Sequence, residues 1–167
     1  CVIHDVEIAL KGSTSEDVSK GLKDGSFGMV KESTDMINKA VSNGKGKFGY
    51  GESVAKALYD NNLHYAELSI IYNAYKFSIP ISVHSAIGTE IIHQHPTVDA
   101  AAVGDTCWTD FKIFSNSISR LNENSIVMNI GSSVIMPEVF LKALTVTRNL
   151  GYKIFGFTTA NFDMIKH

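Results

Sequence analysis

The chain has 167 residues and a formal net charge of −2 at pH 7, with 44% hydrophobic and 19% charged residues. This balance predicts one folded domain with a sizeable core rather than a disordered tail. The lack of a basic excess gives no support to nucleic-acid binding, and the apolar runs are too short to span a bilayer. Two cysteines, Cys1 and Cys107, cannot form a disulfide framework, so we expect a protein of the reducing cytoplasm.

Both ends of the chain resemble cuts within a longer domain. The sequence opens on the apolar residues Cys1–Ile3 without a methionine, and its last residue, His167, comes soon after the last predicted strand. We therefore expect a single domain over residues 1–167 whose sheet has further strands at one or both ends. An active site that uses those strands would be incomplete in this stretch.

The first half of the chain predicts helices joined by polar connectors. We expect a short strand at Cys1–Ile3, a helical turn at Val6–Lys11, a capping box at Gly12–Asp17 and a loop at Gly21–Gly28. Apolar residues at helical spacing predict helices over Met29–Val41, Tyr50–Asn61 and Tyr65–Phe77. The segment Gly44–Lys47 (GKGK) follows a helix and has no Ser or Thr after it, which indicates a helix–helix connector rather than a phosphate loop.

The second half alternates strands with helices. Strands are expected at Ile79–His84, Ile126–Ile130 and Lys153–Phe157, and helices over Asp105–Leu121 and from Pro137 to Leu150, before Gly151. The inward stripe of the first helix is Trp108, Phe111, Phe114 (or Ile113), Ile118 and Leu121. Helical crossovers require parallel pairing, so the predicted fold class is α/β, a Rossmann-like three-layer sandwich with a mainly parallel sheet.

Small and polar residues follow the predicted strands. They lie at His84–Glu90, Gly131–Ser133 and Thr158–Asp163. In an open α/β sheet ligands bind at the carboxyl ends of the strands, and backbone N–H groups at a following helix start favour phosphate. Asp163 could accept a hydrogen bond from ribose or adenine. Any one of these loops alone is a turn, and the case rests on three of them in register.

Histidines are the second notable feature, because His93 and His95 follow His84 closely. An H-x-H pair can bind a metal, and the remaining ligands would come from Glu90, Asp99 or His4, although no familiar spacing links them. One histidine could instead transfer a proton near a bound substrate. In the simplest alternative, one histidine bridges loops and the other is solvated.

Charged residues on the predicted helices divide into structural and functional candidates. Glu138 and Lys142 are four residues apart in the order that favours a surface ion pair. Asp105, near a helix start, complements the helix dipole. Asp110, on the same helix, is a candidate for the site.

Five segments together resemble the deoxyhypusine synthase family, in its bacterial deoxyhypusine synthase-like branch. Cys1–Asp5 stands where the family has a strand that ends in an acidic pair, and Glu67–Ile81 is similar to its "ES-x-x-x-WAYKNNIPV" helix. His84–Thr89 takes the place of its "DGSLGD" loop, Asp110–Ile113 matches "DLRLIN", and Tyr152–Asp163 is similar to the strand that ends in "NTAQEFD".

The resemblance implies a Rossmann-like fold that binds NAD, a homotetramer, and transfer of the aminobutyl group of a polyamine such as spermidine. The residues it places along the dinucleotide are Gly88, Thr89, Thr159, Ala160 and Asp163, and the loop residues Gly131 and Ser132 are further candidates to bind the cofactor. It places His93 or His95 as the active-site histidine, and Asp110 and Asp5 as carboxylates that meet the cationic amine.

Departures from the family pattern keep two other functions open. The loop acids are replaced by His84 and Thr89, and Met136 stands where the family has its catalytic lysine, whose amine forms an imine with the carried group. Lys142 is the next candidate amine, nearly two helical turns further on. The alternatives are a non-catalytic NAD-binding oligomer and a metal-dependent enzyme that uses His93 and His95.

Overall fold

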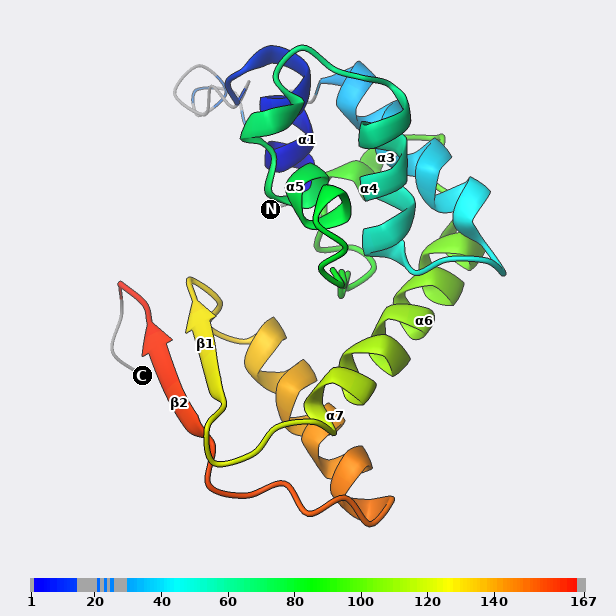
Figure 1. Cartoon of the computed structure of the whole chain (residues 1–167). Helices are drawn as coiled ribbons and strands as arrows, with labels where there is room; N and C mark the ends of the chain where they lie inside the picture. Colours follow the sequence, from blue (N-terminus) through cyan, green and yellow to red (C-terminus); the bar gives the residue numbers. More distant parts are fainter. Residues whose placement is uncertain (1, 15–20, 22, 24, 26–29, 165–167) are drawn as a thin grey trace. The chain divides into compact units, whose positions relative to one another are not determined.

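The computed structural model describes residues 2–14, 21, 23, 25 and 30–164 (Figure 1). It is a mixed α/β structure that is mostly helical, with a small two-stranded parallel sheet. The chain divides into two compact units, which we call unit 1 (Cys1–Thr109) and unit 2 (Asp110–His167). Within the described residues, no helix is both long and apolar enough to cross a membrane.

Unit 1 consists of helices around one apolar core. They are α1 (Val2–Lys11), α3 (Lys31–Gly44), α4 (Tyr50–Asp60), α5 (Ile70–Lys76) and the first part of α6 (Ala100–Ile118), with two 3-10 turns, η1 (Ala66–Leu68) and η2 (Ile91–Gln94). Helix α4 packs against α3 and α5, and α1 packs against α3. Val6, Ile37, Val54 and Leu58 are fully buried in their shared core.

The strand expected at Cys1–Ile3 is wrong, because Val2 and Ile3 belong to α1. Ile3, Val6 and Ala9 are all buried and recur every three residues, which is a helical and not a strand period. A run of three apolar residues is too short to show either period. The expected capping box at Gly12–Asp17 and loop at Gly21–Gly28 lie mostly outside the described residues.

The helix expected over Tyr65–Phe77 is interrupted by Ser69. The turn η1 ends before Ser69 and α5 begins after it. The Oγ of Ser69 accepts a hydrogen bond from the N–H of Tyr72 at 3.0 Å and so caps α5. The cap at Ser69 starts a new helix, and the expected single helix is therefore divided into η1 and α5.

The strand expected at Ile79–His84 is also wrong, since this described segment has no regular secondary structure. Pro80 lacks the N–H group that a ladder would need. The segment runs instead along α4, and a Cβ added to Gly51 would collide with the backbone carbonyl of Ile81. Close backbone contact with a helix has taken the place of pairing in a sheet.

The connector interpretation of Gly44–Lys47 is confirmed, because this segment joins α3 to α4. Gly46 has φ 71°, and its N–H donates to Oδ2 of Asp105 at 2.7 Å. Asp105 was expected near a helix start, but α6 begins five residues earlier at Ala100. Its carboxylate therefore holds the connector rather than the start of its own helix.

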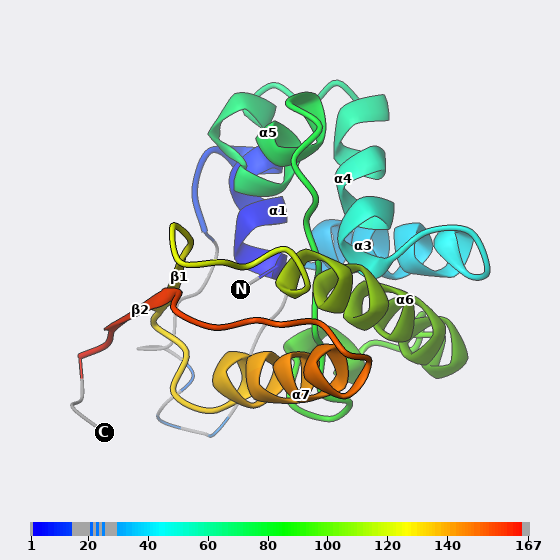
Figure 2. The same cartoon turned by 60° about the horizontal axis from the view of Figure 1, so that its bottom comes forward.

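Unit 2 contains one strand–helix–strand motif. Strand β1 (Ile126–Ile130) lies where it was predicted and leads into α7 (Ile135–Asn149), which has Pro137 in its first turn. Strand β2 (Thr158–Phe162) pairs with β1 in parallel, in a register that places Ile126 opposite Thr158. Figures 1 and 2 show α7 beside the two strands. The parallel pairing is thus confirmed for these two strands.

The last strand starts five residues later than predicted. Within the expected strand Lys153–Phe157, Ile154 is fully buried, and its carbonyl accepts hydrogen bonds from Nε and Nη2 of Arg148 at 3.2 and 2.8 Å. These bonds occupy the backbone group that a ladder would use. The apolar run therefore fills the core of unit 2 as a connector, and β2 follows it.

The core of unit 2 contains most of the predicted stripe of α6. Ile118 is buried with Ala143, Leu144 and Ile154, and Phe111, Phe114, Leu121, Phe140 and Phe157 pack against them. Trp108 is the exception, because its side chain is 60% exposed. The expectation that Trp108 belongs to the core is therefore wrong.

Candidate functional site

A pocket of about 480 Å³ opens within unit 2. Its apolar part comes from Phe114 and Val127 and from the first turns of α7, with Met136, Pro137, Phe140 and Leu141. Its polar part at the carboxyl end of the strands consists of Asn129, Ser132, Ser133, Asn161 and Asp163, and Thr159 lies nearer the start of β2. The remaining lining residues are Met128 and Ala160. The volume is within the range of roughly 300–1,000 Å³ that is usual for small-molecule sites.

The loop after β1 and the residue after β2 are joined at the polar end of this pocket. Ser133 Oγ donates to Oδ2 of Asp163 at 3.0 Å, and the N–H of Gly131 donates to the carbonyl of Phe162 at 2.8 Å. Gly131 has φ 66°, in the left-handed region that glycine tolerates best. These two bonds hold the carboxylate of Asp163 above the carboxyl ends of both strands.

Ser132 satisfies an N–H group in the first turn of the helix that follows. Its Oγ accepts a hydrogen bond from the N–H of Met136 at 3.1 Å, and Pro137, next in the chain, has no N–H to satisfy. The start of α7 carries the positive end of the helix dipole. A partial positive charge and the carboxylate of Asp163 therefore lie at the same end of the pocket.

Two amides complete the polar end. Nδ2 of Asn129 donates to the carbonyl of Ser132 at 2.8 Å and to Oδ1 of Asn161 at 2.6 Å. The sequence did not single out either asparagine. Asn is depleted in strands, so Asn129 within the apolar run IVMNI was the signal that could have revealed it.

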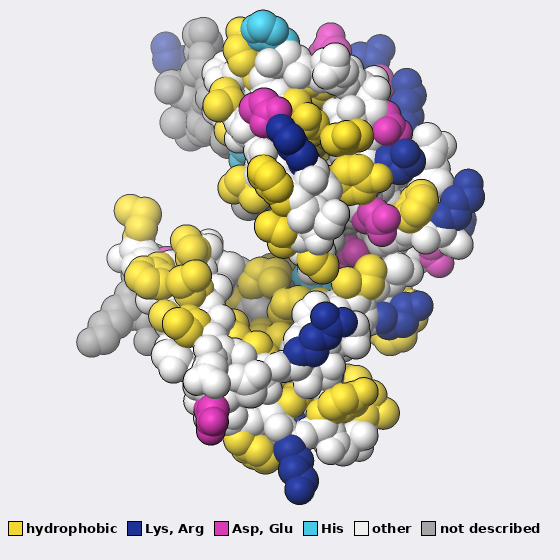
Figure 3. All heavy atoms as spheres, viewed as in Figure 1, with side chains coloured by type: hydrophobic (Ala, Val, Ile, Leu, Met, Phe, Trp, Pro, Cys, Tyr) yellow, Lys and Arg dark blue, Asp and Glu magenta, His cyan; other side chains and the backbone are white. Residues whose placement is uncertain are grey.

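The surface around the strand ends is apolar. Ile130, Val134 and Phe162 are each more than half exposed, and Met164 is fully exposed. In the view of Figure 1, hydrophobic side chains gather over this end of β1 and β2 (Figure 3). A ligand would therefore approach the polar groups across an apolar rim.

Unit 1 brings two of its predicted site residues together. The N–H of Gly88 donates to Nδ1 of His93 at 3.1 Å, and Nε2 of His93 lies 3.4 Å from Oγ of Ser85. Gly88 has φ 95°, and Thr89 is bonded by its own N–H and Oγ1 to the carbonyl of Ala86. His93 thus closes the loop that was expected to bind a dinucleotide.

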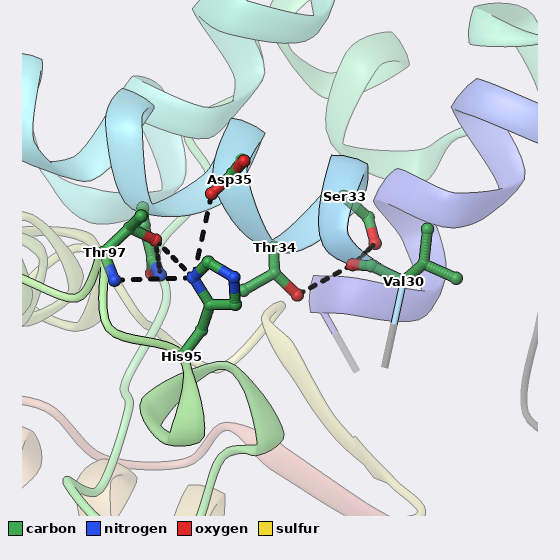
Figure 4. Close-up of polar contacts among 7 residues, drawn as sticks. Val30, Ser33, Thr34, Asp35, His95 and Thr97 are labelled. Atoms are coloured by element: carbon green, nitrogen blue, oxygen red, sulfur yellow. Dashed lines mark hydrogen bonds and ion pairs between the residues drawn. The ribbon is translucent and has the colours of Figure 1, made fainter. Parts of the chain in front are cut away.

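His95 links η2 to α3, as Figure 4 shows. Its Nδ1 lies 2.8 Å from Oγ1 of Thr97 and 3.7 Å from Oδ1 of Asp35. Thr97 Oγ1 also accepts a hydrogen bond from Nδ2 of Asn38 at 2.9 Å. In the same view, the hydroxyls of Ser33 and Thr34 donate to the carbonyl of Val30 at the start of α3. The contacts of His95 are those of a residue that bridges two elements.

Asp5 and Asp110, the two predicted carboxylates, differ in their surroundings. Asp5 accepts hydrogen bonds from Oγ of Ser69 and from the N–H groups of Ile70 and Ile71, at 2.5, 2.8 and 3.1 Å. It therefore stabilises the start of α5. Asp110 is fully buried on α6.

Lys142 forms the predicted surface ion pair with Glu138 on α7. Both side chains are more than half exposed. The described residues that line the pocket include Met136 from the same helix but not Lys142. The structure therefore leaves the only amine candidate of α7 in a surface ion pair.

Of the residues predicted to hold the dinucleotide, Ser132, Thr159, Ala160 and Asp163 line one pocket, and Gly131 adjoins it. Gly88 and Thr89 belong to unit 1. Of the three loops expected to follow strands, Gly131–Ser133 does so, Thr158–Phe162 is itself β2, and His84–Glu90 follows no strand of the structure.

The metal alternative gains no support from this arrangement. Among the described residues, no group of three or more His, Cys, Asp and Glu side chains could hold a metal ion. The expected partners of His93 and His95 therefore do not gather around them.

Comparison with models of protein families, with curated proteins and with solved structures found no match to this chain. The function is therefore argued from the residues of the pocket.

Proposed function

We propose that this chain is a deoxyhypusine synthase-like protein that binds NAD, and that the pocket of unit 2 holds one nucleoside half of the dinucleotide. The observation that carries the proposal is the 3.0 Å bond from Ser133 to Asp163, which places a carboxylate at the carboxyl ends of two parallel strands. In α/β nucleotide sites such a carboxylate binds ribose hydroxyls. The larger architecture that we propose is a Rossmann-like three-layer sandwich in a cytoplasmic homotetramer.

The residues of the pocket fit a nucleoside. Met136, Pro137 and Phe140 offer an apolar surface for a flat base, while Asp163 and Ser133 offer an acceptor and a hydroxyl for ribose. The start of α7, with Gly131 before it, offers a positive partial charge for a phosphate. The pocket therefore supplies each kind of contact that half of NAD requires.

The reaction implied by the family resemblance transfers the aminobutyl group of a polyamine: the amine would be oxidised to an imine, an acceptor amine would replace the diamine that leaves, and the new imine would be reduced. When bound, NAD would accept the hydride in the first step and return it in the last. The resemblance gives Asp110 and Asp5 as carboxylates for a cationic amine such as spermidine, and His93 or His95 as the group that takes up a proton from it. In the structure Asp5 accepts hydrogen bonds at the start of α5 in unit 1, and Asp110 is buried in unit 2.

A second candidate function is NAD binding without group transfer. Met136 occupies the position of the family's catalytic lysine and lines the pocket, and a thioether cannot form an imine. Lys142 is held in its ion pair with Glu138 on the surface. These two observations favour a binding protein over a transferase.

Calorimetric titration with NAD tests both candidates. We expect saturable binding that Asp163→Asn weakens about tenfold or more, because hydrogen bonds to a charged group contribute about 1.5–3 kcal/mol. Asp60→Asn is the matched control: its carboxylate accepts a hydrogen bond from Lys56 on the surface of α4. Equal affinity of the wild type and Asp163→Asn would contradict the proposed site.

Activity then separates the two candidates. A wild-type protein that binds NAD is incubated with spermidine, and the absorbance of NADH is followed. In the absence of an acceptor amine, formation of NADH supports the oxidation step on which the transferase depends, whereas tight NAD binding without NADH supports the binding protein. Light scattering of the same sample tests the proposed tetramer.

A further inference from the structure

Asn129 and Asn161 are neighbours because of the pairing register of the sheet. The register places them directly opposite each other on β1 and β2, so their side chains project from the same face. Both line the pocket of unit 2. These two amides place hydrogen-bond donors and acceptors side by side on one wall of the pocket.

The backbone of Ser132 sets the direction of this pair. A carbonyl oxygen can only accept, so the group of Asn129 that faces Ser132 O at 2.8 Å must be the amide NH₂. The same Nδ2 lies 2.6 Å from the amide of Asn161, so the atom of Asn161 that faces it must be the accepting oxygen, Oδ1. Neither amide can rotate by half a turn without losing these bonds.

This arrangement leaves a defined set of groups for a ligand. Within the described residues, Nδ2 of Asn161 and Oδ1 of Asn129 take part in no further hydrogen bond. Asn161 is exposed in the pocket, so its two N–H groups are accessible. Asn161 is therefore a donor of fixed direction, and Asn129, opposite it on the neighbouring strand, supplies an acceptor.

We propose that Asn161 donates a hydrogen bond to a ring nitrogen of adenine, while Asn129 Oδ1 accepts one from the 6-amino group. This inference rests on the proposed function, because it concerns the same pocket. Adenine offers an acceptor next to a donor at N1 and N6 and again at N7 and N6, which is the pattern that asparagine amides recognise. Its flat faces fit the slot beside Met136 and Phe140. The adenine half of NAD thus occupies this pocket.

Ring-nitrogen analogues test the inference without any change to the protein. Adenosine monophosphate, its 1-deaza analogue and its 7-deaza analogue are titrated into the whole chain. We expect one of the two analogues to bind about three- to tenfold more weakly than the parent, the loss of one net hydrogen bond. If both analogues bind as tightly as the parent, the inference is overturned.

Variants then assign the donor. In Asn161→Ala the difference between the parent and the weaker analogue should disappear, because the donor is gone. Asn161→Asp keeps an oxygen for Asn129 and replaces the donor with an acceptor, so it should weaken adenosine monophosphate more than Asn161→Ala does. Asn149→Ala, on the exposed end of α7, is the control. A difference between the nucleotides that persists in Asn161→Ala overturns the inference.

Failure of the inference and failure of the proposed function are distinguishable. If NAD binds and nicotinamide mononucleotide competes for the pocket while adenosine monophosphate does not, only the inference fails. If neither NAD nor adenosine monophosphate binds, both fail.

Discussion

The N–H of Gly88 donates a hydrogen bond to Nδ1 of His93 across 3.1 Å. An acceptor nitrogen must keep its lone pair, so the hydrogen of the neutral ring lies on Nε2, which faces Ser85. We therefore predict the Nε2–H tautomer for His93, measurable from its ¹⁵N shifts and two-bond ¹H–¹⁵N couplings. His64, which is exposed, gives an internal reference. A ring protonated on Nδ1 alone would contradict the bond.

Acidification should destabilise the protein through His84. Burial lowers the pKa of His84 from its ordinary value of 6.5, so the unfolded chain binds the proton more tightly than the folded chain. The contribution of neutral His84 to stability is complete above pH 6.5 and is lost as the pH falls below it. His84→Gln should flatten this part of the curve of unfolding free energy against pH. If the slope is unchanged in the variant, the pH dependence of the unfolding free energy comes from other titrating groups.

Substitution of Gly51 should be costly. A methyl group there would collide with the backbone carbonyl of Ile81, and overpacking of this kind costs about 1–3 kcal/mol. Gly51→Ala should therefore lower the midpoint of urea unfolding. Gly104→Ala is the matched control, because a Cβ there meets nothing within 4 Å and alanine favours a helix by roughly 0.5–1 kcal/mol. Equal effects of the two substitutions would refute the close contact at Gly51.

Loss of the Asp5 carboxylate should destabilise unit 1 even without substrate. The carboxylate accepts hydrogen bonds from Ser69 and from two backbone N–H groups at the start of α5. Removal of such a cap costs about 0.5–2 kcal/mol. Thermal unfolding of Asp5→Ala, compared with Asp60→Ala at the exposed last residue of α4, measures this contribution. If Asp5→Ala lowers activity but leaves stability unchanged, Asp5 acts on substrate alone.

The helix and strand positions that the sequence predicted best are those whose apolar pattern is unbroken. Strand β1 is a short apolar run between turn residues, and α7 has a proline in its first turn and ends two residues before a glycine, so local chemistry settles both. The strand predicted over Lys153–Phe157 is also a short and largely apolar run. The hydrogen bonds from Arg148 to the carbonyl of Ile154 keep this segment out of the sheet. They form only when α7 packs against the segment, and the local sequence pattern does not show that packing.

The candidate site shows the same division. Ser132 and Asp163 follow strands closely in sequence, and the loop chemistry was enough to select them. Asn129 and Asn161 are 32 positions apart and meet only because the register of two parallel strands aligns them. Asp5 shows the opposite case. Its acidic side chain led us to predict a role at the substrate, whereas its hydrogen bonds are to α5, a helix 65 positions further along the chain.

The register in which β1 pairs with β2 determines which side chains line the pocket. Side chains alternate between the two faces of a strand, so a slip of one residue in β2 would place Phe162 or Ala160, rather than Asn161, opposite Asn129. A single residue added to or removed from the connector between Gly151 and Thr158 could therefore erase the amide edge while every strand and helix remained. The number of residues in that connector therefore matters to the pocket as much as the identity of the two asparagines does.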